Sequence, residues 1–141
     1  MYTPSQQFLA DRERGRPAQE FVAGMFRSFG GQVEVIPDGF FQAYDLSVNG
    51  HTIEVKYDIR AAQTGNFALE LDALFHSKAE WLAIVVDNLR TVYLTPLQEA
   101  LKLAQAWPDK RVTGERSEVS AIVPIKTFIE KLNPQILTTN E

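Results

Sequence analysis

The clearest chemical signal in the chain is a pair of carboxylates and a lysine within residues 44–58, YDLSVNGHTIEVKYD. Alternating apolar and polar residues on both sides of the Asn-Gly pair predict a β-hairpin with a two-residue type I′ turn. That turn sets a register in which Asp45 faces Glu54 across the hairpin, with Lys56 on the same face. The turn thus brings two carboxylates and an amine together.

Two opposed carboxylates need a partner of opposite charge. Directly facing side chains in a hairpin have Cβ atoms about 4.5–5.5 Å apart, so two like charges there are destabilising. A divalent cation with oxygen ligands would remove that repulsion. Lys56 lies diagonal to Asp45, where it can neutralise the pair or act on a bound water. The alternative is a solvated outer face with the lysine in salt-bridge reach, and the hairpin geometry leaves both interpretations open.

The other segments predict an α/β (α+β) fold, in which an N-terminal helix precedes a central mixed β-sheet flanked by helices. Pro17 at an early position and Gly30-Gly31 at the end bound the first helix. Strands are expected at 32–37, 67–71, 81–87, 89–94 and 119–125, a helical turn at 76–80, and helices at 95–107 and 126–132.

Composition and length limit the class of protein. The 141 residues suit a single domain spanning 1–141, with 1–15 and 134–141 expected to be loosely ordered tails. The absence of cysteine excludes disulfides and thiolate metal sites. No apolar run approaches the ~20 residues of a membrane span, and no signal peptide is evident, which predicts a cytoplasmic, intracellular protein without a membrane partner.

The formal net charge of −4 weighs mildly against nucleic-acid binding, because phosphate contacts normally use a surplus of lysine and arginine. Carboxylates that hold divalent cations, however, count as negative in the sequence and are neutralised in the working protein. The charge therefore does not exclude a nuclease.

The pattern D-x8-E-V-K, formed by Asp45, Glu54, Val55 and Lys56 after an N-terminal helix, resembles the motif of the PD-(D/E)xK nuclease superfamily. That superfamily includes restriction enzymes, Holliday-junction resolvases and small phage nucleases. The segments TGNFALEL and HSKAEWLAIVV are similar to segments of its phage-type members. The resemblance covers residues 17–86 and implies a restriction-endonuclease-like core.

A literal Pro37-Asp38 also lies upstream of the Glu-x-Lys sequence. The hairpin register favours Asp45, because Asp45 faces Glu54, whereas Asp38 belongs to a Pro-Asp-Gly turn in which Asp is common for local reasons. Tyr44 then occupies the proline position of the motif, a position that varies in the superfamily.

The resemblance implies a Mg²⁺-dependent deoxyribonuclease, most simply an endonuclease, with Mn²⁺ expected to substitute. Asp45, Glu54 and the Val55 carbonyl would hold the metal, and Lys56 would position or deprotonate a water nucleophile. Glu20 matches a helix-borne acidic ligand of some members, although helical spacing places it nearly opposite the apolar stripe of its helix. The candidate substrate-binding residues are Arg60, Thr64, Asn66, Ser77, Lys78 and Gln19. The alternatives are a capping serine at 77, a surface lysine at 78 and a simple turn at Thr64 and Asn66.

Three functions are compatible with the sequence. The leading hypothesis is a DNA nuclease, acting as a homodimer because one small domain would need a second copy to contact both strands. The phage-type resemblance also fits a phage-encoded protein inside a host cell. The first alternative is a catalytically silent nuclease-fold domain that binds nucleic acid or a protein partner, and the second is an unrelated α/β domain with a coincidental hairpin.

Overall fold

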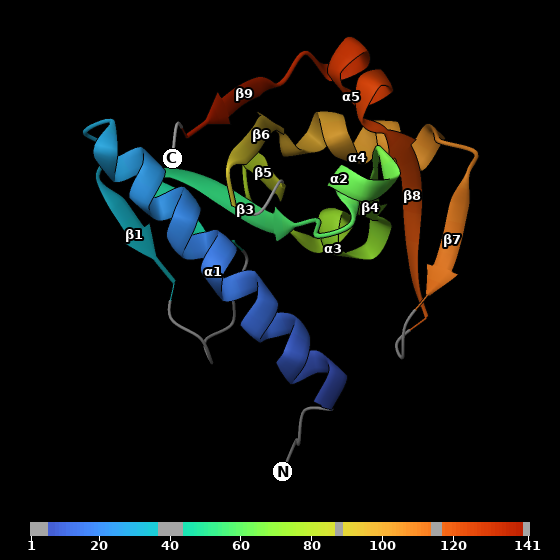
Figure 1. Ribbon diagram of the computed structural model, residues 1–141, viewed down its shortest axis with the longest axis horizontal. Helices are drawn as coiled ribbons and strands as arrows, with labels where there is room; N and C mark the ends of the chain where they lie inside the picture. The colour runs from blue at the N-terminus through green and yellow to red at the C-terminus, as the bar shows by residue number, and fades with distance from the viewer. Residues whose placement is uncertain (1–5, 37–43, 87–88, 114–116, 140–141) are drawn as a thin grey trace.

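The computed structural model describes residues 6–36, 44–86, 89–113 and 117–139, with side chains described outside 6–15 and 113 (Figure 1). Asp38, the residue rejected in favour of Asp45, lies outside these ranges. The helices are α1 (Gln6–Ser28), α2 (Ala61–Thr64), α3 (Leu71–His76), α4 (Leu97–Ala106) and α5 (Ile125–Leu132). The strands are β1 (Val33–Val35), β2 (Leu46–Val48), β3 (His51–Tyr57), β4 (Asn66–Glu70), β5 (Trp81–Val86), β6 (Thr91–Pro96), β7 (Lys110–Thr113), β8 (Glu118–Pro124) and β9 (Gln135–Thr138).

The strands form two sheets. The larger has six strands in the order β1-β2-β3-β5-β6-β9, and it is mixed because β3 and β5 pair in parallel while the other neighbours are antiparallel. The predicted α/β class and the central mixed sheet flanked by helices are confirmed. The second sheet, β4-β8-β7, is antiparallel and was not foreseen, because strands predicted at 67–71 and 119–125 pair with each other instead of joining the central sheet.

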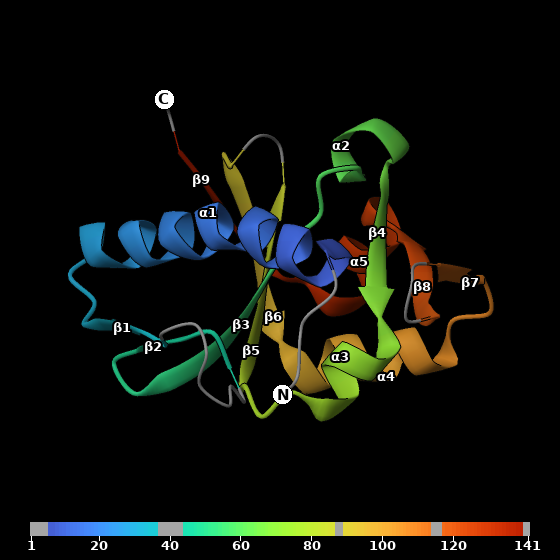
Figure 2. The same cartoon turned by 90° about the horizontal axis from the view of Figure 1, so that it is seen from below.

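Helix α1 crosses one face of the six-stranded sheet (Figure 2). Its buried residues Ala18, Val22 and Met25 recur at helical spacing, and they pack on side chains that alternate along the strands. The strand residues in this cluster are Leu46, Val48, Ile53, Val55, Ala83, Val85, Val92 and Leu94.

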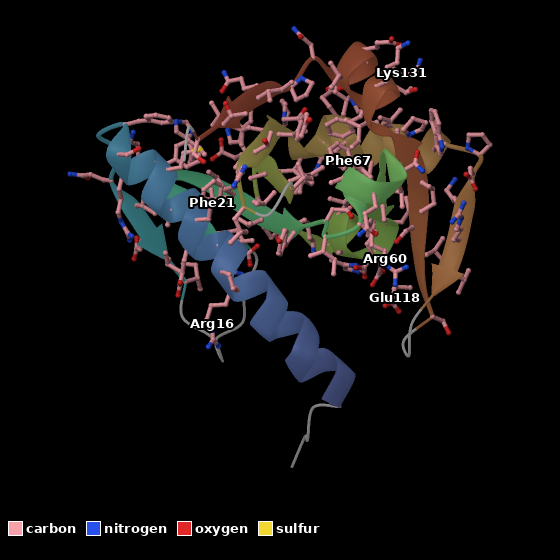
Figure 3. The ribbon with its side chains drawn as sticks, in the orientation of Figure 1. Arg16, Phe21, Arg60, Phe67, Glu118 and Lys131 are labelled. Carbon is pink, nitrogen blue, oxygen red and sulfur yellow. The ribbon has the colours of Figure 1, made fainter. Side chains whose placement is uncertain are left out.

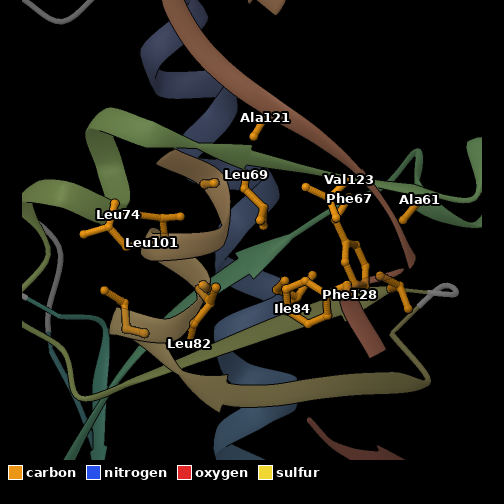
Figure 4. Packing of buried hydrophobic residues seen from close by; sticks show 14 of the residues in the cluster. Ala61, Phe67, Leu69, Leu74, Leu82, Ile84, Leu101, Ala121, Val123 and Phe128 are labelled. Carbon is orange, nitrogen blue, oxygen red and sulfur yellow. The ribbon is translucent and has the colours of Figure 1, made fainter. Parts of the chain in front are cut away.

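The opposite face of the central sheet packs on α3, α4, α5 and the small sheet. Phe67 of β4 is fully buried there, with its ring edge-on to both Tyr93 and Phe128 at centroid distances of 5.2 and 5.0 Å. Figure 4 shows this cluster around Leu82 and Ile84 of β5. Figure 3 labels Phe67 of β4 and Phe21 of α1. Phe67 belongs to the cluster on this face of the central sheet, and Phe21 packs against the cluster on the opposite face.

Regular secondary structure extends into both terminal segments. Helix α1 begins at Gln6, so Pro17 lies inside the helix rather than near its start, and it removes one intrahelical hydrogen bond without ending the helix. Strand β9 pairs with β6, with Leu137 opposite Val92 and packed against the α1-side cluster. Leu137 is partly buried by this packing, and the ladder hydrogen bonds join β9 to the central sheet.

Among the described residues, no helix combines the length and apolar character needed to cross a bilayer.

The aromatic contacts of Phe67 predict a large stability effect. Phe67→Ala should lower the free energy of unfolding by about 3–5 kcal/mol, because it opens a cavity between Tyr93 and Phe128. Phe75 is 64% exposed, so Phe75→Ala should change that free energy by less than about 0.5 kcal/mol. Urea unfolding of both variants measures the difference, and equal losses would contradict the packing described.

Candidate active site

The hairpin turn is of the predicted type. Asn49 and Gly50 both have positive φ values, 51° and 85°, as a type I′ turn requires. The register is also as predicted, since Val48 pairs with His51 and Leu46 pairs with Ile53. A local dipeptide therefore determines which side chains share each face of the hairpin.

Strand β2 leaves β3 at Asp45, one residue beyond the paired segment. The Asp45 amide donates to the Ile53 carbonyl at 3.0 Å, and the Asp45 carbonyl accepts from the Ile36 amide at 3.0 Å. The Asp45 Oδ2 atom then accepts a hydrogen bond from the Val55 amide at 2.7 Å. A side chain thus takes the place of the strand that would otherwise pair with β3 here.

Strand β3 continues to Tyr57 beyond this point, paired with β5 along its other edge. The amide and carbonyl of one strand residue point to the same side. Because the Val55 amide points to Asp45, the Val55 carbonyl also faces the edge that β2 has left. The result is a short stretch of strand edge with a carboxylate beside it.

Asp45 is partly buried and lies against a second carboxylate. Gln19 of α1 donates from Nε2 to Asp45 Oδ1 at 3.2 Å. Burial, and next the negative charge of Glu54, raise the pKa of Asp45 to about 7, while the Val55 amide and Lys56 act in the opposite direction. The predicted juxtaposition of Asp45 and Glu54 is therefore present at the side chains, although the backbone ladder stops at Leu46.

Glu54 is held by two further groups. The Ser77 hydroxyl donates to Oε1 at 3.0 Å, and Lys56 Nζ lies 3.6 Å from Oε2. The Glu54 side chain is 16% exposed and that of Lys56 is 41% exposed. The lysine is therefore both tethered to the carboxylate and accessible from solvent.

The donor set suits a hard divalent cation that keeps several waters. Asp45, Glu54 and the Val55 carbonyl supply oxygen atoms, and each carboxylate oxygen has a lone pair beyond the one used by its present partner. No group of three or more His, Cys, Asp or Glu that could hold a metal occurs in the described part of the chain. Two carboxylates and a carbonyl are nevertheless sufficient for Mg²⁺ when water completes the shell.

Glu20, the predicted extra ligand, is exposed and lines a different hollow with Leu89, Arg90 and Thr139. Its neighbour Gln19 is the α1 residue that reaches Asp45. The structure therefore brings Gln19, and not Glu20, to the carboxylates.

The predicted helical turn at 76–80 is wrong. Helix α3 ends at His76, and residues 77–80 run in a non-helical connection in which the Glu80 amide donates to the Thr52 carbonyl and hydroxyl. Ser77 therefore follows the C-terminal, electronegative end of a helix, which does not favour a phosphate. Lys78 is exposed.

Arg60, Thr64 and Asn66 lie beyond the end of β3, around α2 (Figure 3 labels Arg60). Thr64 and Asn66 bond to each other, as in an ordinary turn, at 3.1 and 3.3 Å. Asp58 accepts from the backbone amides of Arg60 and Ala68, so its carboxylate ties this segment to β3.

No protein-family model and no curated protein sequence matches this chain. Among solved structures, that of a bacterial homing endonuclease, I-Ssp6803I, matches with a TM-score of 0.53 and 19% sequence identity. The match covers 75% of this chain and 84% of that chain. The two share a fold.

The raised pKa of Asp45 predicts how stability depends on pH without metal. Between its unfolded value near 3.8 and its folded value of about 7, the folded state binds more protons, so stability falls as pH rises through this window. The loss is at most about 4 kcal/mol. Asp45→Asn should abolish this component and be more stable than wild type at pH 8.

Urea unfolding in EDTA at pH 5 and pH 8 measures this effect. Asp109→Asn, at an exposed position, is the matched control and should follow the wild-type pH dependence. Parallel profiles for wild type and Asp45→Asn would refute the proposed carboxylate repulsion.

Proposed function

We propose that this chain is a metal-dependent nuclease of the PD-(D/E)xK type that hydrolyses phosphodiester bonds of DNA. The observation that carries the proposal is the meeting of Asp45 and Glu54 beside Lys56, at the edge of β3 just past its pairing with β2. A fold shared with a bacterial homing endonuclease supports it.

Asp45, Glu54 and the Val55 carbonyl would hold Mg²⁺, with Mn²⁺ as a substitute. The bound cation would polarise the scissile phosphate and lower the pKa of a water nucleophile. Asp45 is held from two sides, by Gln19 and by the Val55 amide, so its oxygens have a defined direction before any ligand arrives. Preorganised carboxylates of this kind need little rearrangement on binding.

Lys56 would orient the attacking water or a non-bridging phosphate oxygen. Its Nζ lies close to Glu54 Oε2, and its 41% exposure leaves donor hydrogens free to meet a substrate. Arg60 and Lys78, both exposed, are proposed as phosphate contacts further from the reacting bond. The chain would act in the cytoplasm as a homodimer, so that its two copies contact both DNA strands.

The decisive experiment is DNA cleavage with Mg²⁺ or Mn²⁺. Wild type should cut plasmid, single-stranded or branched DNA, and Lys56→Ala should be slower by about 100-fold or more, because it removes the donor that positions the nucleophile. Lys102→Ala, an exposed lysine on α4, should cut at the wild-type rate.

Three results would contradict or redirect this proposal. Retardation of DNA in a gel without any cutting would favour a silent binding domain. Cleavage by Lys56→Ala at the wild-type rate would remove the lysine from the mechanism. If the protein neither cuts nor binds DNA, an unrelated α/β domain is the interpretation that remains.

Metal binding is tested independently of cleavage by thermal melting. Mn²⁺ should raise the melting temperature of wild type, since saturation to 100 times the dissociation constant adds about 2.7 kcal/mol of stability. Glu54→Gln should lose most of that shift, because it removes a charged ligand while retaining the side-chain volume. Equal shifts in both proteins would place the cation elsewhere.

A further inference from the structure

The Ser77 hydroxyl contacts a backbone amide and a carboxylate. Its Oγ accepts a hydrogen bond from the Ala79 amide at 3.2 Å and donates to Glu54 Oε1 at 3.0 Å. A hydroxyl has a single hydrogen. Because a carboxylate oxygen accepts hydrogen bonds, the hydroxyl supplies the hydrogen in its contact with Glu54.

This arrangement ties Glu54 to the connection between α3 and β5. Ala79 is 5% exposed, so the amide that orients the hydroxyl is itself fixed in the core. Lys56 contacts the other carboxylate oxygen, Oε2. The two contacts together leave the Glu54 side chain little freedom to rotate.

The same bonds argue against a direct phosphate contact by Ser77. Its hydrogen already points to a carboxylate, and the residue follows the electronegative end of α3. An incoming phosphate would have to displace a charge-assisted bond, which is stronger than a neutral one.

We propose that Ser77 is a positioning residue that holds Glu54 in the orientation for cation binding, and that it does not bind the DNA backbone. This inference rests on the proposed function. It replaces the substrate-binding role predicted for Ser77 from the sequence with one that acts through a carboxylate. Residues that orient metal ligands typically contribute about 10–100-fold to metal affinity or activity.

The test compares Ser77→Ala with Ser77→Thr in three measurements: Mn²⁺ affinity by titration calorimetry, single-turnover cleavage, and DNA affinity in EDTA. Ser77→Ala should weaken Mn²⁺ binding and slow cleavage by about 10-fold or more. DNA affinity in EDTA should stay within twofold of wild type. Ser77→Thr should retain wild-type Mn²⁺ affinity and cleavage rate, because it keeps the hydroxyl. The backbone at this position, with φ −68° and ψ 139°, accepts a β-branched side chain.

Ser28→Ala is the matched control. It also removes a serine hydroxyl with one backbone partner, the Met25 carbonyl, but at the end of α1. All three measurements should stay at wild-type values. If Ser77→Ala does not fold, Ser77→Cys replaces it, and its weak thiol donor should give an intermediate loss.

Several outcomes would overturn the positioning role. If Ser77→Ala weakens DNA binding in EDTA and leaves Mn²⁺ affinity unchanged, Ser77 contacts the DNA backbone. If Ser77→Thr binds Mn²⁺ as weakly as Ser77→Ala, the role of Ser77 is one of packing. If wild type binds Mn²⁺ without cutting DNA, the proposed function fails, while the Mn²⁺ affinities still decide the role of Ser77. A wild-type chain that binds no Mn²⁺ overturns both proposals.

Discussion

One backbone amide determines the geometry of the candidate site. The β2–β3 ladder ends at Leu46, while β3 continues to Tyr57, so among the described residues no strand pairs with β3 on the side that the Val55 amide faces. A partly buried N–H group without a partner is costly. The Asp45 carboxylate satisfies it at 2.7 Å, and this bond brings the carboxylate to the edge of β3, beside Glu54. The candidate site therefore begins at the point where the pairing of β2 with β3 ends.

The two carboxylates remain together because each is held by donors from separate elements. Asp45 receives hydrogen bonds from α1 and β3, and Glu54 contacts the connection after α3 as well as its own strand. Helix α1 packs on one face of the central sheet and α3 belongs to the cluster on the other. The site therefore receives contacts from segments that belong to both packed layers.

Local sequence rules predict the hairpin, whereas strands that pair over long sequence separations are poorly predicted from the sequence. Asn49-Gly50 requires positive φ at both positions, so turn type and register follow from two residues. The pairing of β9 with β6 depends on contacts such as Leu137 with Val92, which are far apart in the sequence and leave little local signal. Residues 76–80 favour a helix by composition, but the hydrogen bonds from Glu80 to Thr52 hold an extended path.

The choice between Gln19 and Glu20 shows how helix phase sets the chemistry of the site. Neighbouring helical residues point about 100° apart, and the burial of Ala18 and Val22 fixes which direction faces the sheet. That phase turns Gln19 to Asp45 and Glu20 to a hollow beside Arg90. A third carboxylate beside Asp45 would add to the repulsion that already raises its pKa, whereas the amide donates a hydrogen bond to it. Packing of an apolar helix face thus decides that a neutral donor, not another acid, completes the surroundings of Asp45.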